Sequence, residues 1–285
     1  MHQQMTATAV TLGQIQQQLA TVADNIANVG TTGYKSRDAK FIDLLVQQID
    51  NMRPADIDGT DEANRLTPDG IRRGSGARIG DTSLDLASGS IKQTDNPLDL
   101  ALTDDHQFFT VALTSGNGTA TTAYTRAGDF NVQPDPADPN TLRLLTKSGM
   151  AVLGTNGQPI TIPAHYQSIH IDRTGSINVE LASGAQVNAG QLGLVTVSRP
   201  QLLESQGNSL YTLPNLAQLG IGLNQVVQQV PAADGSVAQG KLENSNVDLT
   251  KEMADLINLQ HNYQLNARSI SISDQMSGLV NSMLH

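Results

Sequence analysis

Three features of this 285-residue chain have residue types and spacing that suggest chemistry: a glycine-rich run, the histidines and an acidic stretch. The run Gly-Ser-Val-Ala-Gln-Gly-Lys at 235–241 has the Gly-x-x-x-x-Gly-Lys spacing of a phosphate-binding loop. Leu242, however, stands where such a loop requires Ser or Thr to ligate magnesium, and no apolar strand leads into the run. We therefore interpret the match as chance within a turn and a strand.

The other candidates for metal or catalytic sites also lack the required spacing. The six histidines include no pair four residues apart on one helix, so no zinc-protease site is predicted. Asp104, Asp105 and His106 are interpreted as a polar hairpin tip. The acidic residues at 56, 58, 61 and 62 do not fit the pattern of a calcium loop, and no Gly-x-Ser-x-Gly elbow occurs. We predict no catalytic residue, no metal and no cofactor, and therefore no enzyme.

The overall composition excludes further classes of function. Without cysteine, the chain has no disulfides and no thiolate chemistry. Seventeen Lys and Arg against 27 Asp and Glu give a net charge of -10, which disfavours nucleic acid and anionic membranes as partners. No apolar run is long enough for insertion into a membrane, and the N-terminus lacks the pattern of a cleaved secretory signal.

The first 33 residues carry the apolar periodicity of a helix. Asp24 is their only formal charge, which indicates burial among neighbouring chains, although a Gln-rich surface helix is the alternative. The Gly-Thr-Thr-Gly segment at 30–33 should end the helix, and Gly30 and Gly33 are predicted hinge residues. The apolar seam, with steps of three or four, comprises Leu12, Ile15, Leu19, Val22, Ile26 and Val29.

A second helix is predicted over the last 40 residues. Asn246 or Asp248 is expected to cap its start. One apolar stripe comprises Leu249, Met253, Leu256, Tyr263, Ala267 and Ile270. A second stripe comprises Leu265, Ile272, Met276, Leu279 and Met283. Two stripes on one helix indicate more than one packing partner.

Between the helices, short runs of β-branched and aliphatic residues alternate with turn signals. The predicted strands include 108–113, 142–146, 168–172, 176–181 and 192–198. After a turn at Asn96-Pro97, Leu98, Leu100 and Leu102 should form the single apolar face of another strand. The predicted fold is α+β, with N- and C-terminal helices paired as a coiled coil and joined to a central antiparallel all-β domain. The expected segments are 1–35 (N-terminal helix), 36–75 (connector), 76–240 (β domain) and 241–285 (C-terminal helix).

Several blocks resemble a known family. The segment 22–35, Val-Ala-Asp-Asn-Ile-Ala-Asn-Val-Gly-Thr-Thr-Gly-Tyr-Lys, resembles the N-terminal signature of flagellar rod and hook proteins. Gly30 departs from the usual Asn, and Tyr34 from the usual Phe. The segments 89–101, 124–130, 207–211 and 239–247 resemble further blocks of the family in the same order, as do Glu252-Met253, Leu256-Ile257, Gln260 and Tyr263 in the terminal helix. The chain is most similar to the distal-rod (FlgG-like) type of this family.

The resemblance implies a structural subunit of the bacterial flagellar basal-body rod. Such a subunit polymerises through its terminal helices into a helical homo-oligomer, the axial drive shaft. The implied partners are neighbouring rod and hook proteins and the flagellar type III export apparatus, and the implied location is the extracytoplasmic part of the basal body, reached without a cleaved signal. The implied assembly residues are Leu12, Ile15, Leu19, Val22, Asn25, Ile26, Asn28, Val29, Met253, Leu256, Gln260, Tyr263, Ala267 and Ile270.

Asn25 and Asn28 receive a specific expectation within that set. Three residues apart on a helix, they should face the same side and fix the register of a dry interface through hydrogen bonds. Two other functions stay open: a hook or proximal-rod subunit of the same family, and a secreted β-domain adhesin or hydrolase. An axial protein needs both terminal helices, whereas an enzyme would keep its activity without them.

Overall fold

The computed structural model describes residues 2–43, 46–49, 71–74, 77–114, 120–136, 138–216, 218, 220–231 and 235–283. The calcium-loop-like acidic residues at 56–62 and most of the predicted connector lie outside these residues. The chain divides into two compact units. The first comprises Met1–Ala23, Ala39–Thr82 and Met253–His285, and the second comprises Asp24–Asp38 and Ser83–Glu252.

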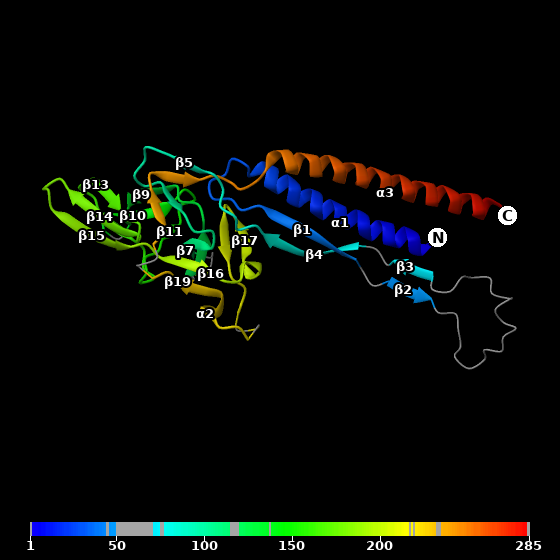
Figure 1. Ribbon diagram of the computed structural model, residues 1–285, viewed down its shortest axis with the longest axis horizontal. Coiled ribbons are helices and arrows are strands. Elements are labelled where there is room, and N and C mark those ends of the chain that lie inside the picture. Colours follow the sequence, from blue (N-terminus) through cyan, green and yellow to red (C-terminus); the bar gives the residue numbers. More distant parts are fainter. Residues whose placement is uncertain are drawn as a thin grey trace. The chain divides into compact units, whose positions relative to one another are not determined.

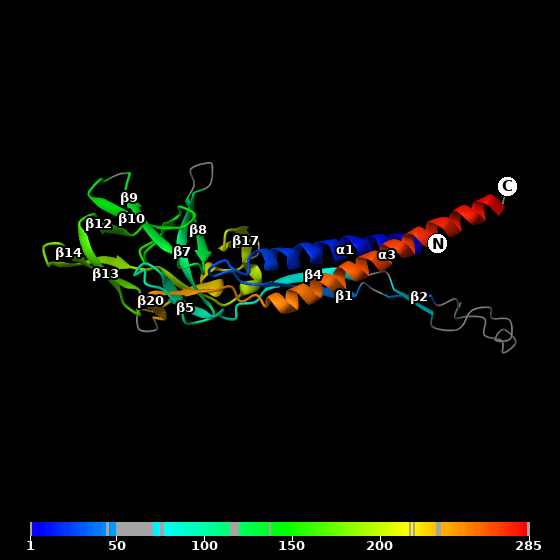
Figure 2. The ribbon, with the colours of Figure 1, turned by 90° about the horizontal axis from the view of Figure 1, so that it is seen from above.

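The first unit contains most of the two terminal helices, α1 (His2–Ala27) and α3 (Leu249–Met283). They run antiparallel and side by side, with the β1–β4 ribbon next to them (Figures 1 and 2). In that ribbon β1 (Arg37–Asp43) pairs with β4 (Ala77–Leu84), and β2 (Val46–Ile49) pairs antiparallel with β3 (Ile71–Gly74). These paired strands, within and beside the predicted connector, were not expected from the sequence.

One face of each long helix is buried, and α3 has a second apolar face that is not. Ile15 and Val22 of α1 and Leu259 of α3 are buried, and the side-chain amide of Gln16 donates a hydrogen bond of 3.1 Å to the Tyr263 hydroxyl. The exposed apolar residues of α3 form a stripe, here called the exposed stripe: Ile257, Leu265, Ile272, Met276 and Leu279. No helix of the described residues is long and apolar enough to cross a membrane.

The second unit is built on a ten-stranded sheet whose described strand pairs are antiparallel. Its path runs β12-β10-β11-β7-β8-β18-β17, with β9 on β10, β16 on β7 and β19 on β16. The strands are β7 (Gln107–Thr114), β8 (Ala120–Thr125), β9 (Phe130–Pro134), β10 (Thr141–Thr146), β11 (Ala151–Val152), β12 (Thr161–Pro163), β16 (Leu194–Val197), β17 (Glu204–Gly207), β18 (Leu210–Thr212) and β19 (Val227–Gln229).

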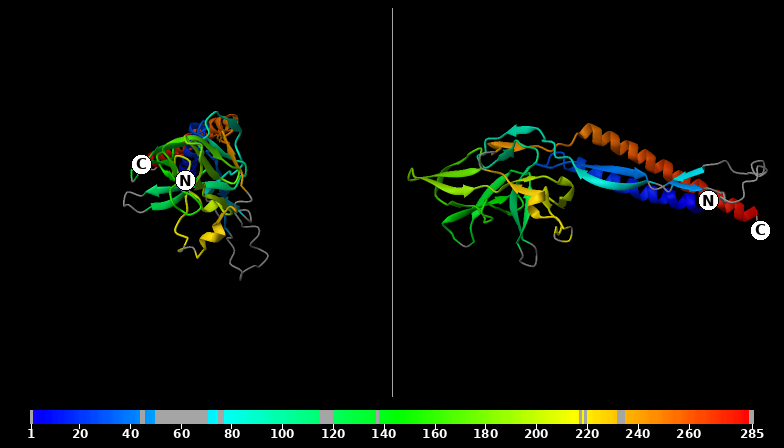
Figure 3. Two further views of the ribbon diagram at one scale, coloured as in Figure 1. Left: turned by 90° about the vertical axis from the view of Figure 1, so that its left-hand side faces the viewer. Right: turned by 60° about the horizontal axis from the view of Figure 1, so that its bottom comes forward.

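Smaller elements complete this unit. A three-stranded sheet, β13 (Tyr166–Ile171), β14 (Ser176–Leu181) and β15 (Gln186–Gln191), projects beyond the larger sheet (Figures 1 and 3). The C-terminal strands β20 (Val237–Gln239) and β21 (Lys241–Glu243) pair with β6 (Leu100–Leu102) and β5 (Ile91–Gln93). Two short helices, η2 (Pro200–Leu202) and α2 (Leu223–Val226), lie in the connections.

Two apolar clusters form the core of the second unit. In the larger cluster the rings of Phe109 and Phe130 meet edge to face with centroids 5.1 Å apart. In the smaller cluster Phe108 packs against Tyr211 in the same way at 5.8 Å. Because Phe108 and Phe109 are neighbours on β7, alternate side chains of one strand supply both clusters.

The predicted class, a central antiparallel β region between terminal helices, is confirmed. Strands form at each predicted run, and Gly157 and Gly175 take positive φ in the predicted turns. One prediction was wrong. The segment after Asn96-Pro97 was expected to have one apolar face, but Leu100, Ala101 and Leu102 are all buried. Alternation along the strand does not appear because the small Ala101 side chain faces a second buried surface.

Candidate functional site

A buried group of three charged side chains, here called the ion triad, joins distant parts of the second unit. Glu243 of β21 accepts hydrogen bonds from Lys35 Nζ at 2.9 Å and from Arg126 Nε at 2.6 Å. The three side chains are each about 1% exposed or less. The amide of Gly89 donates a third bond to Glu243, at 3.0 Å. One carboxylate therefore holds two cations from segments far apart in the sequence.

Arg126 also donates hydrogen bonds to backbone oxygens of β6, of β7 and of the segment between them. Its guanidinium donates to the carbonyls of Leu102, Asp104 and Gln107, and to the Ser88 hydroxyl. Arginine suits this position because its planar group offers five donors in fixed directions. Arg126 thus shapes the chain around β6 and β7 as well as pairing with Glu243.

Lys35 also donates hydrogen bonds to backbone carbonyls, but its burial disfavours the charged form of the ammonium. Its ammonium donates to the carbonyls of Leu86 and Ala87 at 3.1 and 2.7 Å. Burial lowers the pKa of Lys35 below its usual value, while the hydrogen bond to Glu243 opposes that shift. The Glu243 carboxylate therefore favours the charged form of this buried ammonium.

Two glycines allow the backbone to approach the triad closely. At Gly33, φ is +63° and an added Cβ would lie 2.5 Å from the amide nitrogen of Ala127. At Gly89, an added Cβ would lie 2.0 Å from the carbonyl oxygen of Asn244. The amide of Gly33 donates to the Glu243 carbonyl at 2.8 Å. Since side chains at these positions would displace backbone, glycine is required at both.

Asn25, in the last turn of α1, is almost fully buried and uses its whole side-chain amide within the chain. Its Nδ2 donates to Glu252 Oε1 and to the Arg37 carbonyl, both at 3.0 Å. Its Oδ1 accepts from the Arg37 amide at 3.1 Å and from the Tyr34 hydroxyl at 3.2 Å. Glu252 lies in the first turn of α3, so this one amide ties the ends of both helices to the segment between them.

We expect Asn25→Leu to lower the free energy of unfolding by about 2–4 kcal/mol, because it removes the hydrogen bonds of the Asn25 amide to the Arg37 backbone and to the buried Glu252 carboxylate. Asn28→Leu is the control. Among the described residues, the Asn28 side chain bonds only to the Asp24 carbonyl and the Thr31 hydroxyl, so its loss should cost under about 1 kcal/mol. Urea unfolding of both variants measures the two losses of unfolding free energy. Equal losses would contradict the role of Asn25 in holding the ends of both helices.

The start of α3 is fixed by two further side chains. Asp248 Oδ1 accepts from the amide of Thr250 at 2.9 Å, which confirms it as a cap. Asn246, the other predicted cap, has a different role: it accepts from the Ser36 amide at 2.7 Å and donates to the carbonyls of Asp85 and Ala87. Asn246 therefore bridges the segment after α1 and the segment after β4.

The predicted assembly residues fall into three classes of exposure. Asn25, Ile15 and Val22 are buried. Leu12, Leu19, Ile26, Asn28, Leu256, Tyr263, Ala267 and Ile270 are half-buried, and Val29, Met253 and Gln260 are exposed. Gln260 was expected from the family resemblance, whereas the structure buries its neighbour Leu259, which lies three residues after Leu256 and so on the same side of the helix. Of the predicted hinge residues, Gly33 is enclosed and Gly30 has open space around it.

Sequence reasoning singled out none of the triad side chains as a site. Each stood in a recognised block, but a lone charge in a polar segment does not reveal its burial.

The segments with apparent chemical spacing prove to be structural. Residues 237–239 and 241–243 are strands, so the run at 235–241 has no helix N-terminus to bind phosphate. Asp105 bonds the Ser88 hydroxyl and Asp104 bonds the His106 amide. Among the described residues, no three His, Asp or Glu are grouped to hold a metal ion.

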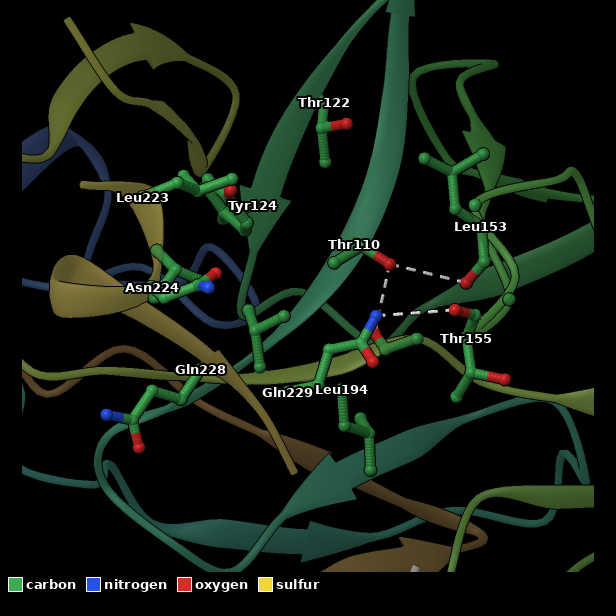
Figure 4. A pocket seen from close by; sticks show the side chains of 15 residues that line it. Thr110, Thr122, Tyr124, Leu153, Thr155, Leu194, Leu223, Asn224, Gln228 and Gln229 are labelled. Carbon is green, nitrogen blue, oxygen red and sulfur yellow. Dashed lines mark hydrogen bonds between the residues drawn. The ribbon is translucent and has the colours of Figure 1, made fainter. Parts of the chain in front are cut away.

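A cavity of about 470 Å³ opens on the ten-stranded sheet between β7, β8, β16 and β19 (Figure 4). Its lining is apolar, hydroxyl and amide, and Tyr124 is the titratable group in it. Thr110 directs its hydroxyl to the carbonyls of Leu153 and Gly193, at 3.4 and 3.1 Å. Burial raises the pKa of Tyr124, so its phenol stays protonated near neutral pH. The lining offers no acid and base pair for catalysis.

Three family models match the chain in the order of its elements. The flagella basal body rod protein model matches residues 8–35, the flagellar hook protein FlgE/F/G D1 domain model matches 104–179, and the flagellar basal body rod FlgEFG protein C-terminal model matches 238–283. The chain is 39% identical over 285 residues to the flagellar hook-basal body complex protein FlhP of Bacillus subtilis, covering 98% of each chain. The chain belongs to the flagellar basal-body rod protein family. It is also 33% identical to the flagellar basal-body rod protein FlgG of Bacillus subtilis and 31% identical to that of Borreliella burgdorferi, covering 92% of this chain and 91% of each relative.

Membership of this family gives the recognised blocks a common physical explanation. Lys35, Gly89, Arg126 and Glu243 come from four separate blocks and meet at the ion triad. Asn25 and Asn246 belong to the same blocks and hold the adjoining backbone. In this rod-family chain, the blocks encode a buried junction at which the ends of the terminal helices meet the β domain segments.

Tyr211 makes the stability of this chain sensitive to alkaline pH. Burial raises the pKa of Tyr211 to about 12, above the ordinary value of 10.0. A raised folded pKa contributes stability that is complete below about pH 10 and is lost as pH rises from 10 to 12, by up to about 2–3 kcal/mol. Burial lowers the pKa of Lys35, which acts in the opposite direction as pH approaches 10.5.

Urea unfolding at pH 8 and pH 11 compares the wild-type chain with Tyr211→Phe. We expect the wild-type chain to lose more stability between these pH values, by about 1 kcal/mol or more, because the variant has no phenol to ionise on unfolding. Identical pH dependence of the two proteins would show that Tyr211 is not shielded from water.

Proposed function

We propose that this chain is a non-enzymatic structural subunit of the bacterial flagellar basal-body rod, which polymerises through its terminal helices. The observation that carries this proposal is the exposed stripe of α3. Leu265, Ile272 and Leu279 are 55–61% exposed and recur every seven residues. A row of large apolar side chains on a soluble protein is typical of an interaction surface.

The exposed stripe lies opposite the inward face of α3. Leu256 and Leu265 are nine residues apart, which is about 180° around a helix of 3.6 residues per turn. Since Leu256, Leu259 and Tyr263 face the first unit, the exposed stripe is free for a second copy. We propose that α1 and α3 pair as a coiled coil within one chain and that the exposed stripe binds neighbouring chains.

The predicted assembly residues keep their proposed role in this polymer. The near-absence of charge in residues 1–33 supports burial of α1 among copies. The amide of Asn25 is used within the chain, so Asn28 is the residue proposed to fix the register between chains. An Asn28→Leu chain that still forms rods would contradict that proposal. Gly30 and Gly33 are proposed to let the chain turn from α1 into the segment 34–38.

The wider setting follows from the same proposal. The chain would assemble as a homo-oligomer next to rod and hook proteins, after export without cleavage by the flagellar type III apparatus to the extracytoplasmic part of the basal body. The predicted segments, 1–35, 36–75, 76–240 and 241–285, are retained as proposed domains. A place elsewhere in the hook-basal body complex is the second candidate, favoured by the similarity to a relative named for that complex. The adhesin or hydrolase alternative is not retained, since the chain belongs to a rod family.

Two charges placed in the exposed stripe test the proposal. Ile272→Glu with Leu279→Glu should abolish incorporation into basal bodies and motility, because buried carboxylates without partners oppose association. Gln264→Glu with Ser271→Glu adds the same charge at exposed polar positions of α3 and should assemble normally. Thermal unfolding checks that both chains keep their fold. Normal incorporation of the first variant would refute polymerisation through this stripe.

A further inference from the structure

The ion triad is unbalanced until Glu243 is in place. Lys35 and Arg126 supply two positive charges, and Glu243 supplies the single negative charge that contacts both. All three side chains are buried, and removing one partner of a buried ion pair typically costs about 3–5 kcal/mol. Without Glu243, the same packing would enclose two cations with no counter-charge.

Glu243 is the last of the three charged residues along the chain. Lys35 follows α1 and Arg126 follows β8, whereas Glu243 ends β21, six residues before α3 begins. β21 pairs with β5 and β20 with β6, so Glu243 reaches the triad only when the C-terminal strands dock. Docking of the C-terminal strands on β5 and β6 therefore also brings the counter-charge to the buried cations.

The same docking fixes the ends of both terminal helices. The Glu243 carbonyl accepts from the Gly33 amide, and Asn246 accepts from the Ser36 amide. Beyond them, Glu252 accepts from Asn25 in the last turn of α1. These bonds join the segment 24–38 to the segment 243–252. The Gly33 amide, the Lys35 ammonium and the Ser36 amide bond to Glu243 or Asn246, whereas the backbone of Arg37 bonds to Asn25.

We propose that Glu243 is a latch: its docking against Lys35 and Arg126 locks the segments that carry α1 and α3 together, so that the chain presents its helices as a pair only when its C-terminal strands are in place. This inference rests on the proposed function, since only a chain that polymerises through both terminal helices needs them held as a pair. A chain still lacking docked C-terminal strands would be kept out of the polymer.

Amide hydrogen exchange on the unassembled full chain tests the latch. In Glu243→Gln, the amides of Gly33, Ser36 and Arg37 should exchange about 100-fold faster, while those of Val111 and Ala123 in the core strands change by less than about 3-fold. Glu204→Gln, which changes an exposed carboxylate on β17, should leave every one of these rates unchanged. Equal acceleration in the core and in the latch segments, or no acceleration, would overturn the proposal.

A milder variant covers the case in which Glu243→Gln does not fold. Lys35→Met leaves the Arg126–Glu243 pair balanced and removes the Lys35 bonds to Glu243 and to the carbonyls of Leu86 and Ala87. It should accelerate exchange at Ser36 and Arg37 by about 10-fold and leave the amide of Asn244 in place. Unchanged exchange at Ser36 and Arg37 would equally overturn the latch. Because the measurement needs no polymer, its failure would leave the proposed rod function untouched.

Discussion

Arg126→Met should lower the free energy of unfolding by about 4 kcal/mol or more, one of the two largest effects expected of a single substitution in this chain. Methionine fills much of the volume but donates no hydrogen bond. The carbonyls of Leu102, Asp104 and Gln107 would then lose the guanidinium as a donor, and Glu243 would keep its bonds from Lys35 and Gly89. Chemical denaturation followed by far-ultraviolet circular dichroism measures the loss.

Arg143→Met is the matched control for that substitution. Arg143 pairs with Asp135 at 2.7 Å, but its side chain is 30% exposed and water can replace the contact. Its substitution should cost at most about 1 kcal/mol. If Arg126→Met cost no more than this control, the carbonyls around Arg126 would have to find other donors, and the triad would not organise the second unit.

Gly128→Ala should be the other strongly destabilising change, by about 3 kcal/mol or more, through steric overlap alone. An added Cβ would lie 1.8 Å from the carbonyl oxygen of Leu100, and the amide of Leu100 donates to the Gly128 carbonyl at 3.0 Å. The backbone of β6 would have to move away and release that bond. A melting temperature lowered by several degrees or more, together with reduced soluble yield, is the expected result.

Gly184→Ala separates steric overlap from backbone conformation. Gly184 has φ of +80° in the turn between β14 and β15, and an added Cβ meets nothing within 4 Å. Only the cost of a left-handed alanine remains, about 1 kcal/mol. A Gly128→Ala chain as stable as Gly184→Ala would mean that β6 and the loop at 126–129 do not approach as closely as described.

Local patterns in the sequence were sufficient to predict the helices and most strands. The seam of α1 and the cap at Asp248 follow from spacing and residue type, which act over a few neighbouring residues. The same holds for the turns at Gly157 and Gly175, where positive φ favours glycine. Strands such as β7 and β14 were found because apolar β-formers lie between such turns.

Contacts between distant segments could not be predicted in this way. Nothing near Glu243 indicates that Lys35, 208 residues earlier, is its partner. The pairing of β1 with β4 spans the segment 44–76 and likewise has no local signal. Leu100, Ala101 and Leu102 were assigned one buried face because apolar alternation along a strand cannot show that both of its faces are buried.

The resemblance to rod proteins supplied what the patterns did not, but without a physical reason for each block. The structure provides that reason for the segments at 89–101, 124–130 and 239–247, which meet around one carboxylate. The exposed stripe of α3 was predicted as a second apolar stripe, and its exposure in the single chain agrees with a packing partner outside that chain.

Electron microscopy of isolated basal bodies tests the proposed rod function most directly. A short epitope placed at Ser183-Gly184, in an exposed turn with open space around it, allows the β domain to be labelled without disturbing the triad. We expect antibody label along the axial rod, and rods that are absent or truncated in cells lacking this chain. Complete rods without label, in motile cells that lack the chain, would contradict its role as a rod subunit.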